Sequence, residues 1–174
     1  NQVDFVHHGN LKGFVKFQLT DGTNYDELHY ITVTANKVVI QNKINQKLHV
    51  FPGTQQTISK HHLYSFTTDG KETPIVYHII QPSSFGKVLK NMTDGSLKIT
   101  KSFSQQDINQ GLIIYEQSEQ IDEIIAQDEM VVNIQSQSLE PLIGIKFKIE
   151  ISIINLTNKL VHQLDSLIQT QPLI

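Results

Sequence analysis

Apolar and polar residues alternate along most of the chain, and this period of two is the pattern of half-buried β-strands. The clearest run is 147–153, in which Phe147, Ile149, Ile151 and Ile153 alternate with polar side chains. The same alternation predicts further strands at 3–7, 15–19, 28–35, 75–80, 86–89, 97–99, 112–115 and 130–134. Turn signals such as Thr-Asp-Gly-Thr at 20–23 separate the strands, so the pattern predicts a β-sandwich or a β-barrel.

Two short segments break the alternation and carry helix-capping signals. In 103–111, Ser104 suits the N-cap and Asp107 the third helical position, and the flanking apolar residues can form a hydrophobic staple. In 58–63, Ser59 is the expected cap of a similar turn. Both turns are expected to hold an apolar residue against the sheet.

Three strand segments recur at a spacing of 110 to about 118 residues: 3–7 resembles 113–117, 17–20 resembles 132–135, and 31–34 resembles 149–152. A period of this length indicates tandem domains rather than a short solenoid repeat. We therefore interpret 1–40 as the C-terminal strands of a preceding repeat and 41–154 as a complete repeat. The remaining residues, 155–174, form either a linker or the start of the next repeat. Leucines at helical spacing make a helix an alternative to a strand in this segment.

The composition supports a mainly β protein and excludes several classes. The chain has 23 Ile and 12 Val but only two Ala, and β-branched residues favour strands over helices. The absence of Cys excludes a disulfide framework and a thiolate zinc site. The net charge of −3 gives no electrostatic signature of nucleic-acid binding, and no apolar run approaches the roughly 20 residues that span a bilayer.

An ordered set of segments resembles the CSPG repeat, which occurs in cell-surface chondroitin sulfate proteoglycans and in the Fraser-syndrome family of matrix proteins. The resemblance covers about 150 residues, and its strongest stretch is Ser102–Gly111, followed by Ile113 and Tyr115. The other matching segments are 3–9, 17–22, 58–63, 74–79 and 81–89.

The resemblance implies a cadherin-like antiparallel β-sandwich with short helical turns, within the tandem ectodomain of a cell-surface or secreted matrix protein. It implies an extracellular, non-enzymatic adhesion module that binds matrix proteins such as collagens, or growth factors, and that contacts neighbouring repeats. It implies no nucleic-acid or membrane contact by this segment. A carbohydrate-binding β-sandwich and a purely structural spacer remain as alternatives.

Calcium is the candidate cofactor, because cadherin-like units often carry an Asp-x-Asp loop and calcium prefers hard oxygen ligands. The matching loop here reads Thr67-Thr68-Asp69, so one carboxylate is replaced by a hydroxyl. Asp69 and Asp128 are the expected ligands, with Glu72 or Asp21 as further candidates. The ordinary alternative for each is a solvated aspartate in a turn.

The remaining candidate chemistry is sparse. Two sequons, Asn91-Met92-Thr93 and Asn155-Leu156-Thr157, make Asn91 and Asn155 candidate N-glycosylation sites. The pair His61-His62 is expected to cap or pack rather than to bind a metal. No nucleophile elbow, phosphate loop or zinc motif occurs, so the sequence predicts no enzyme.

Overall fold

The computed structural model describes residues 12–70, 73–137 and 139–152, and the chain divides into two compact units, Asn1–Val38 and Val39–Ile174. The expected strand at 3–7, the sequon at Asn155 and the candidate ligand Glu72 lie outside the described residues. So does the segment 155–174. No helix among the described residues is long and apolar enough to cross a membrane.

The first unit contains an antiparallel hairpin of β1 (Lys12–Phe17) and β2 (His29–Thr34). The turn between them follows the predicted signal, since the Asp21 carboxylate accepts the backbone N–H groups of Thr23 and Asn24. These two hydrogen bonds lower the pKa of Asp21. One face of the hairpin is mostly apolar, with Val15 opposite Ile31 at its centre, and both side chains are exposed.

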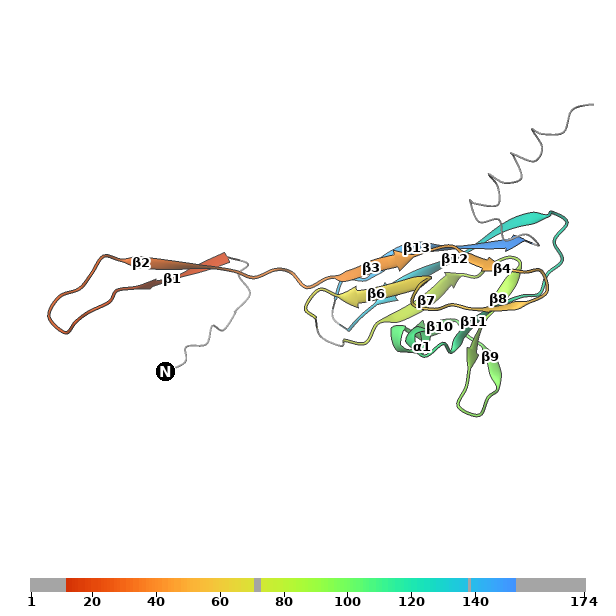
Figure 1. The fold of residues 1–174 in the computed structure, drawn as a ribbon, viewed down its shortest axis with the longest axis horizontal. Coiled ribbons are helices and arrows are strands. Elements are labelled where there is room, and N and C mark those ends of the chain that lie inside the picture. The colour runs from red at the N-terminus through yellow and green to blue at the C-terminus, as the bar shows by residue number, and fades with distance from the viewer. Residues whose placement is uncertain (1–11, 71–72, 138, 153–174) are drawn as a thin grey trace, which may run out of the picture. The chain divides into compact units, whose positions relative to one another are not determined.

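The second unit contains eleven strands and one helix among its described residues (Figure 1). They form sheets in the orders β10-β7-β12-β13-β4, β5-β11-β8-β9 and β3-β6. Their bounds are β3 (Ile40–Asn45), β4 (Leu48–Val50), β5 (Gln55–Thr57), β6 (Leu63–Thr67), β7 (Val76–Gln81), β8 (Gly86–Asn91), β9 (Leu97–Ile99), β10 (Ser102–Ser104), α1 (Gln105–Asn109), β11 (Ile113–Gln117), β12 (Ile125–Gln135) and β13 (Leu142–Ser152).

One apolar core joins the three sheets of the second unit. The longest strands, β12 and β13, form a hairpin whose inward row is buried over most of its length, and Met130 lies opposite Phe147. The predicted alternation on β13 is confirmed for Phe147, Ile149 and Ile151, each 0% exposed. Further large buried side chains come from β4, β6, β7, β11 and α1, among them Leu48, Leu63, Tyr77, Ile108, Ile113 and Tyr115. The mainly β fold is therefore confirmed.

The predicted capped helix is present as α1. The Ser104 hydroxyl accepts the backbone N–H of Asp107, and the Asp107 carboxylate accepts the backbone N–H of Ser104, so the capping box is complete. At the other end, Gly111 has a positive φ of 71° and donates its N–H to the carbonyl of Ile108. Leu112 donates to the carbonyl of Asp107, which completes a Schellman motif.

The second capped segment forms a turn rather than a helix. The carbonyl of Ser59 accepts the N–H groups of His62 and Leu63, and the N–H of Ser59 donates to Nδ1 of His62. His62 therefore closes the turn with its own side chain. The flanking apolar residues, Ile58 and Leu63, are both 0% exposed, as a staple requires.

The alternation pattern did not predict five strands of the second unit, namely β3, β4, β5, β6 and β10. Three of them contain only three residues, too few for a period of two to stand out. One pairing also departs from the antiparallel rule, because β4 runs parallel to β13 with Leu48 opposite Ile149.

Candidate functional site

Asp128 lies in the core-facing row of β12 and is 8% exposed. Its Oδ1 accepts the backbone N–H groups of Ser84 and Glu129, and its Oδ2 accepts the backbone N–H of Phe85, all at 2.9 Å. Oδ2 also accepts the hydroxyl of Tyr115 at 2.9 Å. The carboxylate therefore ties the loop between β7 and β8 to both large sheets, because Tyr115 belongs to β11.

Tyr115 reaches this carboxylate only because residue 86 is a glycine. A Cβ on Gly86 would lie 2.4 Å from the carbonyl oxygen of Glu116 and 2.5 Å from Cζ of the Tyr115 ring. Burial raises the pKa of the Tyr115 phenol, and the adjacent Asp128 charge raises it further. The hydroxyl thus stays protonated and donates. We refer to Asp128, Tyr115, Gly86 and the Ser84–Phe85 backbone as the Asp128 clamp.

The second candidate calcium ligand, Asp69, lies in the turn after β6. It accepts a hydrogen bond from the Thr67 hydroxyl at 2.7 Å. The turn adjoins the start of β7, whereas Asp128 binds the loop that follows the end of β7. A six-residue strand spans about 20 Å. Asp69 and Asp128 are therefore not brought together, and no group of three acidic, His or Cys side chains that could hold a metal occurs within the described ranges.

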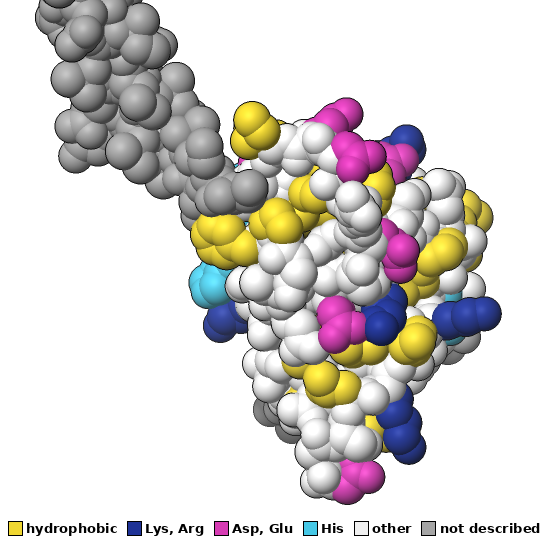
Figure 2. All heavy atoms as spheres, turned by 90° about the vertical axis from the view of Figure 1, so that its right-hand side faces the viewer, with side chains coloured by type: hydrophobic (Ala, Val, Ile, Leu, Met, Phe, Trp, Pro, Cys, Tyr) yellow, Lys and Arg dark blue, Asp and Glu magenta, His cyan; other side chains and the backbone are white. Residues whose placement is uncertain are grey.

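Residues 119–129 contain five acidic side chains, and those other than Asp128 divide between a loop and a strand. Glu119, Asp122 and Glu123 are exposed in the loop between β11 and β12. Glu129, on β12, pairs with Lys146 on β13 at 2.8 Å. On the face drawn in Figure 2, acidic and basic side chains likewise lie close together among scattered apolar ones.

The first sequon, at Asn91, lies where β8 ends. β8 and β9 form a hairpin that extends from the body of the unit (Figure 1). The backbone N–H of Asn91 donates to the carbonyl of Leu112, and its side chain is half-buried. The structure thus places this candidate site at the base of a projecting hairpin.

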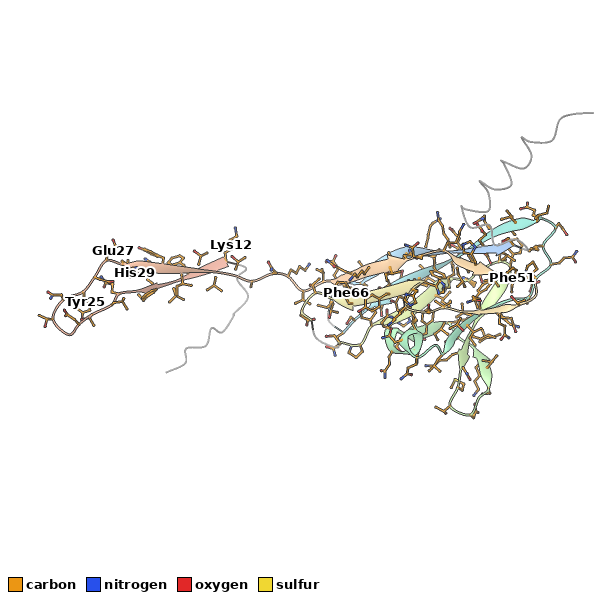
Figure 3. All side chains as sticks on the ribbon, viewed as in Figure 1. Lys12, Tyr25, Glu27, His29, Phe51 and Phe66 are labelled. Carbon is orange, nitrogen blue, oxygen red and sulfur yellow. The ribbon has the colours of Figure 1, made fainter. Side chains whose placement is uncertain are left out.

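A groove along β6 was not foreseen from the sequence. Its wider part, about 600 Å³, lies between β6, the start of β7 and α1. A second hollow of about 470 Å³ adjoins it, since Tyr64 and Asn109 line both. We call the two together the β6 groove. Phe66, labelled in Figure 3, lines the wider part and stacks on Tyr64 with ring centroids 6.2 Å apart.

The hollow at one end of the β6 groove is basic. It is lined by Lys43, Lys60 and His61 together with Ile44, Tyr64 and Asn109, and no acidic residue lies in this described lining. The side chains of Lys43 and Lys60 make no ion pair with any described residue. By contrast, Lys47, Lys87, Lys90 and Lys146 are all paired with carboxylates.

The floor of the wider part contains buried polar groups. The carbonyl oxygen of the Gln105 side chain accepts the backbone N–H of Ser65 at 2.8 Å and the hydroxyl of Tyr77 at 2.6 Å. Its Nε2 donates to Asn109 at 3.0 Å. Ser65 is 1% exposed, and its hydroxyl has no hydrogen-bond partner among the described residues.

A smaller hollow of about 290 Å³ contains two histidines, His49 and His62. Nδ1 of His49 lies 3.1 Å from a Glu150 oxygen, and Lys47 pairs with the same carboxylate. Burial lowers the pKa of His62, and the neighbouring His61 and His49 lower it further. Both effects favour the neutral imidazole, the form that accepts the Ser59 N–H.

Mostly antiparallel strands around one apolar core, with one capped helical turn among the described residues, define the class of a cadherin-like β-sandwich repeat. The Cadherin-like family matches residues 39–136, more than half of the chain, and the chain belongs to this family. The resemblance to the CSPG repeat is confirmed. The chain is 30% identical over 116 residues to chondroitin sulfate proteoglycan 4 of Homo sapiens, and 28% identical to those of Rattus norvegicus and Mus musculus. Each match covers 66% of this chain and 5% of the relative, so the chain spans a small part of their length.

Proposed function

We propose that the chain is a non-enzymatic adhesion and interaction module in the extracellular part of a cell-surface or matrix proteoglycan-like protein. Its partners would be matrix proteins such as collagens, or growth factors. The observation that carries this proposal is the similarity to chondroitin sulfate proteoglycan 4 over a stretch that makes up only 5% of that protein. A unit of this size within a much larger relative fits one module of an extended ectodomain.

The domain organisation belongs to the same proposal. Residues 1–40 would be the C-terminal strands of a preceding repeat, residues 41–154 a complete repeat, and residues 155–174 a linker or the start of the next repeat. The hairpins support it. Val15 lies opposite Ile31 in β1-β2, and Met130 lies opposite Phe147 in β12-β13, so the strand register relates the two pairs at offsets of 115 and 116 residues. This register places Ile31 at Phe147, two residues before the Ile149 that the segment resemblance gives. Met130 and Phe147 are 0% exposed, whereas Val15 and Ile31 are 43% and 54% exposed. The first pair would be covered by the remaining strands of its own repeat.

A domain replacement tests the interaction role against the spacer alternative. In the intact ectodomain, residues 41–154 are replaced by a cadherin-like repeat of unrelated sequence, which keeps the spacing of the array. We expect binding to immobilised collagen or to a growth factor panel to fall when this repeat is replaced. Unchanged binding to every partner would support a spacer and contradict the proposal.

Glycosylation at Asn91 and Asn155, and calcium binding by Asp69 and Asp128, stay predictions. Secretion from an animal cell line followed by endoglycosidase treatment tests the first, because each occupied site adds a removable mass. Asn91→Gln and Asn155→Gln variants would assign it. The calcium prediction is tested together with the Asp128 clamp, as described in the Discussion.

A further inference from the structure

We propose that the β6 groove binds a sulfated oligosaccharide chain, with its anionic groups at the basic hollow and its sugar rings along β6. This goes beyond the module function proposed above, because a repeat can serve in an adhesive array whether or not this groove is occupied. The two inferences therefore fail independently.

The charge of the hollow selects an anionic ligand. Lys43 projects from β3, and Lys60 and His61 come from the turn before β6, so three basic side chains from two segments line one depression. Neither lysine is neutralised by a described carboxylate, although the chain as a whole has a net charge of −3. Lysine ammonium groups are strongly hydrated point charges that suit the oxygens of sulfate and carboxylate groups.

The remaining lining suits sugar rings. Tyr64 and Phe66 occupy successive positions on one face of β6, and their half-exposed rings lie nearly parallel, with an interplanar angle of 18°. Aromatic faces pack against apolar ring surfaces, and tyrosine adds a polar tip. Gln106 and Asn109 are exposed amides of α1 beside them. The Gln106 amide offers donors and an acceptor to hydroxyl groups, and the NH₂ group of Asn109 offers donors while its oxygen accepts from Gln105.

The main competitor is an acidic peptide that would add a strand to the edge of β6. Such pairing needs the outward backbone groups of the strand. The N–H of Ser65, at the centre of β6, is already taken by the side chain of Gln105. The Gln105 side chain therefore prevents a peptide strand from hydrogen-bonding to β6 at Ser65. The side chains of Tyr64 and Phe66 stay accessible in the groove.

The test is a titration of the full chain with a heparin-derived sulfated hexasaccharide, followed by NMR chemical shifts. We expect saturable binding with the largest shifts at Lys43, Lys60 and Tyr64, and weaker binding at higher salt. The double variant K43Q/K60Q should weaken binding at least about tenfold. The control K98Q/K101Q removes two exposed lysines elsewhere on the unit and should change binding less than about twofold.

Each of the following results would overturn the proposal. The first is that the hexasaccharide does not bind, and the second is that the two double variants weaken binding equally, which would indicate attraction to any lysine. The third is that a chemically desulfated hexasaccharide binds as tightly as the sulfated one. The fourth is that a hexaglutamate peptide binds as tightly as the sulfated hexasaccharide and causes the same chemical-shift changes. Melting curves of the two double variants check that the fold is kept. The four substituted lysine side chains are exposed, so their replacement leaves the core intact.

Discussion

Replacing Asp128 by Asn tests whether this carboxylate is a structural clamp. The substitution keeps the size of the side chain but turns one acceptor oxygen into a donor amide. If Oδ1 is kept toward Ser84 and Glu129, the new NH₂ group faces the N–H of Phe85 and the hydroxyl of Tyr115. The tyrosine hydroxyl can rotate and accept, whereas the backbone N–H of Phe85 cannot.

The expected loss follows from these contacts. A hydrogen bond to a charged group contributes about 1.5–3 kcal/mol, and a buried donor left without a partner costs about 1–3 kcal/mol. Water can replace part of the loss at Ser84, which is exposed, but less at half-buried Phe85. We therefore expect Asp128→Asn to lower the free energy of unfolding by about 2–3 kcal/mol, and Asp128→Ala by about 3–4 kcal/mol.

Urea unfolding followed by far-ultraviolet circular dichroism measures these changes. Asp122→Asn is the matched control, because it removes an exposed carboxylate from the preceding loop and should change stability by less than about 0.5 kcal/mol. A double-mutant cycle with Tyr115→Phe should give a coupling energy of about 1 kcal/mol. If Asp128→Asn is as stable as the unmodified chain, or if the coupling is zero, the clamp interpretation is wrong.

The same variants decide the calcium prediction. A ligand that binds only the folded state raises its stability in proportion to the logarithm of ligand concentration. If Asp69 and Asp128 bind calcium, millimolar calcium raises the melting temperature of the unmodified chain and not of Asp128→Asn or Asp69→Asn. An unchanged melting temperature of the unmodified chain in calcium would contradict the prediction, which the separation of the two carboxylates along β7 disfavours.

Three further perturbations test other parts of the unit. Gly86→Ala should destabilise it by about 1–3 kcal/mol in urea unfolding, because the new methyl group overlaps the Tyr115 ring. Ser104→Ala removes the N-cap of α1 and should cost about 1 kcal/mol in the same assay. His62 accepts a hydrogen bond from Ser59, and its pKa in the folded chain is lowered below 6.5. The unfolded chain therefore binds a proton on this histidine more readily than the folded chain does. The stability that neutral His62 contributes is fully present above pH 6.5 and is lost as the pH falls through the folded-state pKa. His62→Gln should reduce the pH dependence of the urea midpoint in that window.

Two of these substitutions have a matched control in the same chain, and the third has a result that would contradict it. Gly13→Ala introduces a methyl group where nothing lies within 4 Å and should leave unfolding of the second unit unchanged. Ser118→Ala removes an exposed loop hydroxyl, and equal losses for Ser118→Ala and Ser104→Ala would refute the capping argument. For His62→Gln, an unchanged slope of the urea midpoint against pH would show that other groups carry the dependence.

The local features of the fold could be predicted from the sequence because they depend on residues close together in the chain. The capping box of Ser104 and Asp107 needs a spacing of three, and the buried row on β13 needs a period of two. The β4-β13 pairing is different, since Leu48 and Ile149 are about a hundred residues apart and three-residue strands carry little periodic signal. Long-range pairing of this kind depends on the packed core rather than on local pattern.

The role of Asp128 escaped prediction for a related reason. On the sequence it stands in an acidic run, which is typical of a solvated loop. The signal that could have shown otherwise is its place in the row Ala126, Asp128, Met130, Val132, at a spacing of two. A polar residue in such a row must be hydrogen-bonded if it is buried. Two of its four donors, however, come from a loop more than forty residues away, which one sequence does not reveal.

In this module, the residues that stabilise the fold, such as those of the Asp128 clamp, differ from the residues that line the basic part of the β6 groove. The core consists of aliphatic and aromatic side chains and of buried polar groups that hydrogen-bond within the unit, among them Asp128 and Gln105. Lys43, Lys60 and His61 project from β3 and a turn into the groove and are exposed, so substituting them should alter binding while changing stability little. The same sandwich can therefore carry different ligand preferences in different repeats, because the residues that select a ligand are not those that hold the sheets together.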